Sequence, residues 1–182
     1  MGFNKEEKKT LLKIARDTIL ARLENKTAPE FSVKARNYNL HAGAFVTLHL
    51  KTGELRGCIG QMFSEEPLYK TVIEMAQEAA FDDPRFTPVT PAEMKELKIE
   101  ISVLSPLQRI PTADKIKLGT HGVLVKKGPY SGVFLPQVAV ETGWGLEEFM
   151  NNLCAGKAGL REDAWKDKNT ELYVFTVAII SE

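Results

Sequence analysis

Residues 44–60, with the sequence AFVTLHLKTGELRGCIG, decide how the fold is predicted. Large aliphatic side chains alternate with polar or small ones from Ala44 to Leu50 and again from Leu55 to Gly60. This is the period of a β-strand with one buried face. The intervening KTGE segment supplies a turn, so the stretch predicts a β-hairpin.

The alternation also predicts the register of this hairpin. The large aliphatic side chains all fall on one side only if Leu50 pairs with Leu55, because a slip of one residue would mix the two faces. The cross-strand pairs expected in this register are Leu50–Leu55, Leu48–Gly57 and Val46–Ile59. The face opposite the core is then expected to carry Phe45, Thr47, His49, Arg56, Cys58 and Gly60.

The rest of the chain alternates between helical and strand periods. A capping box of Asn4 and Glu7 is expected to start the first helix. Helices are predicted over 5–25, 65–80, 90–97 and 145–159, and strands over 98–105, 122–127, 131–135 and 171–180. Strands arranged in hairpins, with helices inserted between them, predict an α+β fold with a mostly antiparallel sheet flanked by helices, as a single domain over 1–182.

Composition limits the classes of function. The chain has 182 residues, 43% hydrophobic and 26% charged, as in a soluble globular protein. Lys and Arg balance Asp and Glu at 24 each, so nucleic acid is not an expected partner. The first residues carry no apolar signal segment and no later run is long enough to cross a bilayer, which favours a cytoplasmic protein without a membrane partner.

The cysteines and histidines offer few ligands for a metal. Only Cys58 and Cys154 are present, and neither forms a recognisable ligand spacing with the three histidines. We therefore predict no disulfide framework, no metal site and no cofactor. Cys154 lies on an apolar helical pattern and is expected to be a core residue.

Cys58 is the main candidate for chemistry. A nucleophilic thiol needs a nearby cation or hydrogen-bond donor, which Arg56 and His49 could supply from the same face of the hairpin, beside Thr47. Gly57 and Gly60 allow a bulge, or the close approach of a ligand or another backbone. The alternative is that Cys58 is a small packed residue and Arg56 an ion-pair anchor.

Other candidates lie outside the hairpin. The DDPRF segment is interpreted as an Asx turn with a local ion pair; as a ligand site, Arg85 could instead bind a small anionic ligand, a carboxylate or phosphate, with an Asp such as Asp83 as base. His121, between glycines, could transfer protons or be a solvated turn residue. Glu141 could line a pocket or lie beside an aromatic side chain packed at a helix start.

Five segments together resemble the AMMECR1 domain family, whose hallmark is LRGCIG. They are GAFVTLHLKTGELRGCIGQ, AAFDDPRFTPVTPAEMKELKIEISVLSP, IKLGTHGVLVKKG, GVFLPQVAVETGW and LCAGKAGL. The resemblance implies an α+β fold in two unequal, interleaved lobes. It also implies component A of a system with a Memo-like protein and a radical SAM protein, which are often encoded beside this domain or fused to it. It brings no established catalytic residues.

Two hypotheses follow. In the first, the chain is an enzyme or enzyme component in which Cys58 is a nucleophile or thiyl carrier, Arg56 tunes the thiol or binds an anion, and His49 or His121 transfers protons. In the second, the same strand face docks a partner protein or small ligand without chemistry. Nucleic-acid binding ranks below both.

Overall fold

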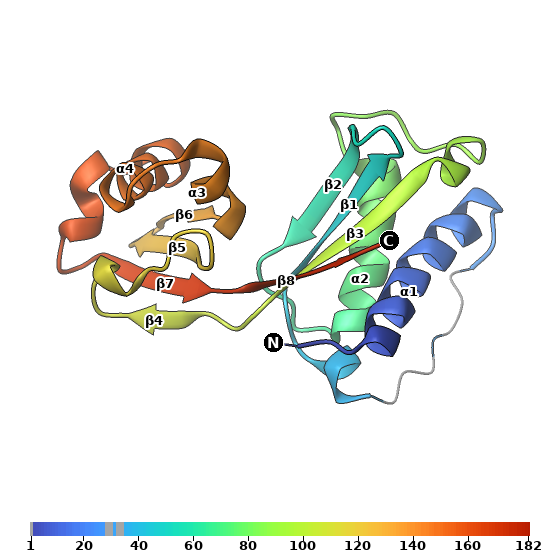
Figure 1. The fold of residues 1–182 in the computed structure, drawn as a ribbon, viewed down its shortest axis with the longest axis horizontal. Helices are drawn as coiled ribbons and strands as arrows, with labels where there is room; N and C mark the ends of the chain where they lie inside the picture. Colours follow the sequence, from blue (N-terminus) through green and yellow to red (C-terminus); the bar gives the residue numbers. More distant parts are fainter. Residues whose placement is uncertain (1, 28–30, 32–34) are drawn as a thin grey trace. The chain divides into compact units, whose positions relative to one another are not determined.

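The computed structural model of the protein describes residues 2–27, 31 and 35–182. The chain divides into two compact units (Figure 1). The first unit comprises Met1–Leu104 together with Ala178–Glu182, and the second comprises Ser105–Val177. Each unit holds one four-stranded antiparallel sheet and its own helices, so the α+β class and the two unequal, interleaved lobes are confirmed.

The first unit is built on a sheet with strand order β2-β1-β3-β8. Its strands are β1 (Ala44–Leu50), β2 (Leu55–Gln61), β3 (Leu97–Leu104) and β8 (Val177–Ser181). Its helices are α1 (Lys5–Leu23), α2 (Leu68–Gln77), the π-helix η2 (Glu78–Asp82) and the 3-10 turns η1 (Arg36–Asn39) and η3 (Glu93–Lys95).

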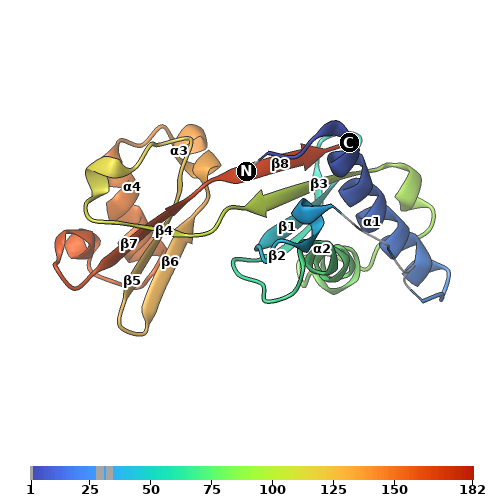
Figure 2. The ribbon, with the colours of Figure 1, turned by 90° about the horizontal axis from the view of Figure 1, so that it is seen from below.

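Both long helices cover the same face of this sheet (Figure 2). Val46 and Leu48 of β1 and Ile101 of β3 are completely buried there against α1 and α2. Because side chains alternate along a strand, the intervening residues point to the other face. No helix of the first unit, among the residues described, lies on that second face, which we call the open face.

The hairpin register is partly as predicted. The pairs Leu48–Gly57 and Val46–Ile59 are confirmed, but the pair Leu50–Leu55 is wrong. The turn closes one residue earlier, since the N–H of Leu50 donates to Glu54 O at 2.8 Å, and Leu55 therefore lies opposite His49. A β-bulge takes up the extra residue, Arg56, and leaves Leu55 40% exposed.

Two predicted helices of the first unit have different bounds. The helix predicted over 65–80 begins at Leu68, after Pro67, and continues as the π-helix η2 to Asp82. The segment 90–97 forms only the three-residue turn η3 before β3 starts. The capping box predicted for Asn4 and Glu7 is confirmed, because both of its hydrogen bonds are present.

The second unit has the strand order β4-β7-β5-β6. Its strands are β4 (Gln108–Ile110), β5 (Gly122–Lys127), β6 (Tyr130–Phe134) and β7 (Glu171–Phe175). Its helices are α3 (Pro136–Thr142), α4 (Leu146–Asn152), the π-helix η5 (Leu153–Lys157) and the 3-10 turns η4 (Ala113–Lys115) and η6 (Glu162–Lys166). Phe149, Met150 and Leu153 pack onto Val123 and Val125 to form its core.

The hairpin predicted over 122–135 is confirmed, and so is the helix that starts near 145, although it ends as a π-helix. The final strand predicted over 171–180 is wrong as a single element. It breaks at Thr176 into β7 and β8, which belong to different sheets, and Ile179 is 53% exposed rather than buried. β4 and α3 were not predicted.

No helix among the described residues is both long and apolar enough to span a bilayer.

Candidate functional site

Cys58 lies in the middle of β2, which is an edge strand of the first sheet. It is opposite Thr47 of β1, and the Thr47 Oγ1 and Cys58 Sγ atoms are 3.2 Å apart, within hydrogen-bonding distance. Thr47 alternates with the buried Val46 and Leu48, so this pair lies on the open face. The thiol is half-buried, and a hydroxyl group is its neighbour.

The outer edge of β2 is occupied by the DDPRF segment. Asp83 Oδ2 accepts the backbone N–H of Cys58 at 2.9 Å, and Arg85 Nη2 donates to the Cys58 carbonyl oxygen at 3.0 Å. Both backbone groups of Cys58 on this edge are therefore bonded by side chains. Asp83 and Arg85 are also paired with each other at 2.8 Å, and the backbone N–H of Arg85 donates to Asp83 Oδ1, which confirms the predicted Asx turn and ion pair.

Asp83 is a buried carboxylate with a strongly stabilised charge. Its side chain is 2% exposed, whereas that of Arg85 is 55% exposed. The hydrogen bonds from the Arg85 guanidinium lower the pKa of Asp83 well below its ordinary range, and the backbone N–H groups of Cys58 and Arg85 add to this effect against the cost of burial. Asp83 is therefore a weak proton acceptor that fixes the backbone of Cys58 and the Arg85 guanidinium by hydrogen bonds.

Gly57 allows the π-helix η2 to reach β2. A Cβ atom at this position would overlap the carbonyl oxygen of Ala79 in η2, so only glycine permits the approach of the two backbones. The π-helix ends at Asp82, and the next residue is Asp83. The close contact at Gly57 therefore brings the residue that bonds Cys58 alongside the edge of β2. This is the backbone approach that was expected as one use of the glycine.

Arg56 makes its contacts away from the thiol. Its Nε donates to Glu93 Oε1 at 2.8 Å and its Nη2 lies 3.4 Å from Pro88 O, with the side chain 11% exposed. The bond from Arg56, above all, lowers the pKa of Glu93 to about 2. No hydrogen bond or ion pair within the described ranges joins Arg56 to Cys58. Arg56 is therefore an ion-pair anchor, as the alternative interpretation of this residue expected.

The other predicted residues of the hairpin are on the open face. His49 is two residues from Thr47 on the same strand and therefore shares its face, opposite Leu55. Gly60 lies under the ring of Phe45, where a Cβ atom would collide with that ring. The space above Gly60 is thus filled by a side chain of the protein itself.

Three predicted residues are in the second unit. His121 precedes β5, and its Nδ1 accepts the backbone N–H of Lys117 at 3.2 Å. Glu141 is exposed in α3. Cys154 is completely buried in the core around Phe149, and burial raises the pKa of its thiol. The expectation that Cys154 is a core residue is confirmed.

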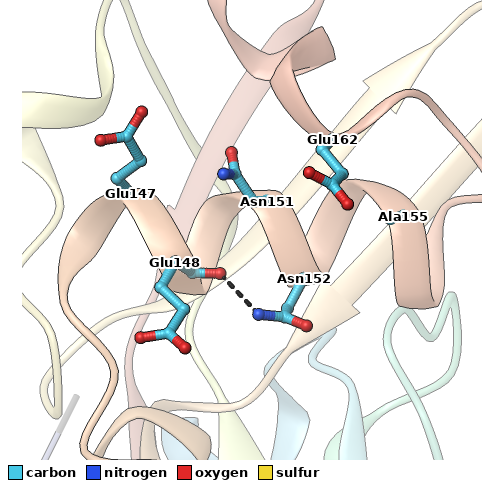
Figure 3. A pocket seen from close by; sticks show the side chains of 6 residues that line it. All are labelled: Glu147, Glu148, Asn151, Asn152, Ala155 and Glu162. Carbon is cyan, nitrogen blue, oxygen red and sulfur yellow. Dashed lines mark hydrogen bonds between the residues drawn. The ribbon is translucent and has the colours of Figure 1, made fainter.

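The second unit also has an open hollow beside α4 (Figure 3). It has a volume of about 380 Å³ and is lined by carboxylate and amide side chains. The lining residues are Glu147, Glu148, Asn151, Asn152, Ala155 and Glu162. Asn152 donates a hydrogen bond to the carbonyl oxygen of Glu148 at 2.9 Å, and Glu147 accepts one from Lys166 at 2.7 Å. None of the residues predicted for the site lines this hollow.

Sequence reasoning missed Glu93, Phe86 and Ala79 as parts of the site. Glu93 was not connected with Arg56, although a buried arginine requires a carboxylate partner. Phe86 lies with its ring centre 5.9 Å from the Arg56 guanidinium and 5.5 Å from that of Arg85. The signal that could have found Glu93 and Phe86 is the need of each arginine for partners, whereas Ala79 is a backbone contact that only Gly57 hints at.

The sequence and the structure match known proteins of one kind. The sequence model of AMMECR1 matches residues 12–180. Protein NEQ441 of Nanoarchaeum equitans is 40% identical over 178 residues, covering 94% of this chain and 98% of that protein. Protein TK0174 of Thermococcus kodakarensis is 46% identical over 149 residues, covering 77% of this chain and 72% of that protein.

A solved structure has the same fold. The crystal structure of the uncharacterized protein PH0010 from Pyrococcus horikoshii superposes with a TM-score of 0.84 at 39% sequence identity, covering 99% of this chain and 93% of that one. Two linked α+β units, each with one four-stranded antiparallel sheet, thus define the class of protein. The chain belongs to the AMMECR1 family.

Proposed function

We propose that this protein acts through the thiol of Cys58, as component A of a system that includes a Memo-like protein and a radical SAM protein. The observation that supports a chemical role is the set of hydrogen bonds that Asp83 and Arg85 form with the backbone of Cys58, which we call the clamp. The backbone of Cys58 is bonded on the outer edge by Asp83 and Arg85, while its thiol is turned to the open face beside Thr47. Reactive groups work best when the surrounding structure holds their geometry.

In this proposal the thiolate of Cys58 is the nucleophile. The Thr47 hydroxyl lies 3.2 Å from the sulfur, within hydrogen-bonding distance, and helps to hold the nucleophile in place. His49, on the same face, is the nearest candidate in the hairpin to accept the thiol proton. Arg56 is committed to Glu93, so we assign it to the support of β2 rather than to the thiol.

The experiment is site-resolved alkylation with iodoacetamide at pH 7, read by peptide mass spectrometry. An activated Cys58 reacts faster than the thiol of free glutathione under the same conditions. The buried Cys154 serves as the internal control, because it reacts only when the second unit opens. A Cys58 that reacts as slowly as Cys154 in the folded protein contradicts the proposal.

The partner proteins give a second test. Cys58→Ser is compared with Cys154→Ser in a reconstituted mixture with the Memo-like protein, the radical SAM protein and S-adenosylmethionine. We expect Cys58→Ser alone to abolish any turnover or protein radical that depends on this chain, with the fold unchanged by circular dichroism. Equal behaviour of the two variants would count against a chemical role for Cys58.

A binding or scaffold module is the second candidate function. The observation that favours it is the exposure of apolar side chains on the open face: Leu55, opposite His49, is 40% exposed, and Ile179, which alternates with the buried Ile180, is 53% exposed. In that case Leu55→Glu abolishes binding of a partner protein while Cys58→Ser retains it. The reverse pattern supports the thiol chemistry.

A further inference from the structure

The cation beside Cys58 is Arg85, not Arg56. The Arg85 guanidinium donates hydrogen bonds from Nε and Nη2 to the carboxylate of Asp83. Nη2 also donates to the carbonyl oxygen of Cys58. The third nitrogen of the guanidinium, Nη1, has no acceptor among the residues that the structure describes. Two of the three nitrogens therefore fix the guanidinium in place, and the remaining one is available to a ligand.

The ion pair presents its positive side to solvent. Asp83 balances the charge of Arg85, but its side chain is 2% exposed while that of Arg85 is 55% exposed. A ligand that approaches this edge of β2 therefore meets the guanidinium, and the screened carboxylate lies behind it. The hydrogen bonds that Arg85 donates to Asp83 raise the pKa of Arg85, and the Cys58 side chain adds to this effect, as expected for a thiol close to the guanidinium.

An aromatic ring restrains the guanidinium further. Arg85 lies 5.5 Å from the centre of the Phe86 ring, and Arg56 is 5.9 Å from the same ring. The two arginines differ in what they can still bind. The side chain of Arg56 is 11% exposed and is bonded to Glu93 and Pro88, so it is much less accessible to a ligand than that of Arg85, which is 55% exposed.

We propose that Arg85 is the anion-recognition residue of the Cys58 site, so that the ligand carries an oxyanion, a carboxylate or a phosphate, within reach of both Nη1 and the sulfur. An arginine with a fixed plane and a free nitrogen suits the geometry of such groups. This inference rests on the proposed function of Cys58 and adds the chemical class of the substrate. Asp83 acts in it as a positioning residue.

The test compares two alkylating probes of similar size. Iodoacetate carries a carboxylate and iodoacetamide is neutral; with both, the Cys58 thiolate forms a thioether, iodide leaves and the thiol proton passes to solvent. We expect Arg85→Gln to lower the ratio of the iodoacetate rate to the iodoacetamide rate by about fivefold or more. Arg85→Lys, which keeps the charge, should retain part of the ratio.

Arg22 provides the matched control. It also pairs with an aspartate, Asp82, at 3.0 Å and lies over an aromatic ring, Phe81, at 4.5 Å. Arg22→Gln removes the same charge from the protein but has no contact with Cys58, so the rate ratio should stay at the wild-type value. A ratio that is unchanged in Arg85→Gln, or that falls equally in Arg22→Gln, overturns the inference.

A titration separates failure of this inference from failure of the proposed function. Inorganic phosphate and acetate are added in turn to the labelled wild-type protein and to Arg85→Gln, and the signals of the Arg85 Nε–H and the Cys58 amide are followed by nuclear magnetic resonance. Signal shifts that occur in the wild type and are lost in Arg85→Gln support anion binding, even if Cys58 reacts with neither iodoacetate nor iodoacetamide. Whether phosphate or acetate causes the shifts distinguishes phosphate from carboxylate recognition. Absence of shifts with both anions overturns the inference, whereas an inert Cys58 overturns only the thiol chemistry.

Discussion

The backbone N–H of Cys58 donates a 2.9 Å hydrogen bond to Oδ2 of Asp83, which lies 25 positions further along the chain. This bond ties the LRGCIG segment to the DDPRF segment and makes the two motifs one structural unit. Because β2 is an edge strand, the same bond also closes a position at which another strand could pair.

Asp83→Asn should destabilise the protein by about 2 kcal/mol, because it replaces charge-assisted hydrogen bonds to Cys58 and Arg85 with weaker neutral ones. The measurement is the free energy of unfolding in urea. Asp82→Asn is the control, since Asp82 pairs with Arg22 at the exposed surface and its loss should change the free energy by less than about 1 kcal/mol. Equal losses of unfolding free energy in the two variants would show that the clamp on Cys58 stabilises the protein no more than an exposed ion pair does.

Gly57→Ala should destabilise the first unit by about 2 kcal/mol or more, because the added methyl group overlaps the carbonyl oxygen of Ala79. Separation of η2 from β2 should also increase hydrogen exchange at the Cys58 amide. Gly156→Ala is the control, since a Cβ atom there has no neighbour within 4 Å. Unchanged exchange at Cys58 in Gly57→Ala would contradict the contact.

Glu93 should contribute to the loss of stability in acid. Its pKa is about 2 in the folded protein and near 4.5 when unpaired, so the unfolded state binds the proton more readily. The contribution is therefore complete above about pH 4.5 and is lost as the pH falls towards 2. Glu93→Gln should be less stable than the wild type at pH 7 and should lose less stability between pH 5 and about 2, as measured by urea unfolding at each pH. Parallel pH curves for the two proteins would count against the Arg56–Glu93 pair.

Thr47→Val should lower the rate at which iodoacetamide modifies Cys58 by about fivefold, because it removes one hydrogen bond of about 1 kcal/mol to the sulfur while keeping the shape of the side chain. Thr47→Ser keeps the hydroxyl and is the control. If the valine variant reacts at the wild-type rate, the hydroxyl does not stabilise the thiolate.

The local features of the first unit could be predicted from the sequence. The two-residue period of 44–50 and 55–61 identifies both strands, and the pairs Leu48–Gly57 and Val46–Ile59 follow from it. The same period failed at Leu55, because a bulge interrupts the alternation. A bulge depends on how the turn closes, here through the bond from Leu50 to Glu54, and apolar patterning does not report that bond.

The candidate site was predicted in pieces. Cys58, Asp83 and Arg85 were each singled out from local sequence, but their contact joins residues that are distant in the chain, and no local pattern specifies it. The expected partnership of Arg56 and Cys58 rested on strand parity alone. A buried guanidinium is stable only with an ionic partner, and Glu93 supplies one from a different element.

The position of β8 has a consequence for synthesis on the ribosome. β3 and β8 are neighbours in one sheet, although residues 105–176, which form nearly the whole second unit, come between them in the chain. Translation therefore releases three strands of the first sheet before the second unit and the fourth only after it. The second unit is therefore synthesised before the first unit has its last strand. A chain whose synthesis stops before residue 177 would leave the edge of β3 unpaired.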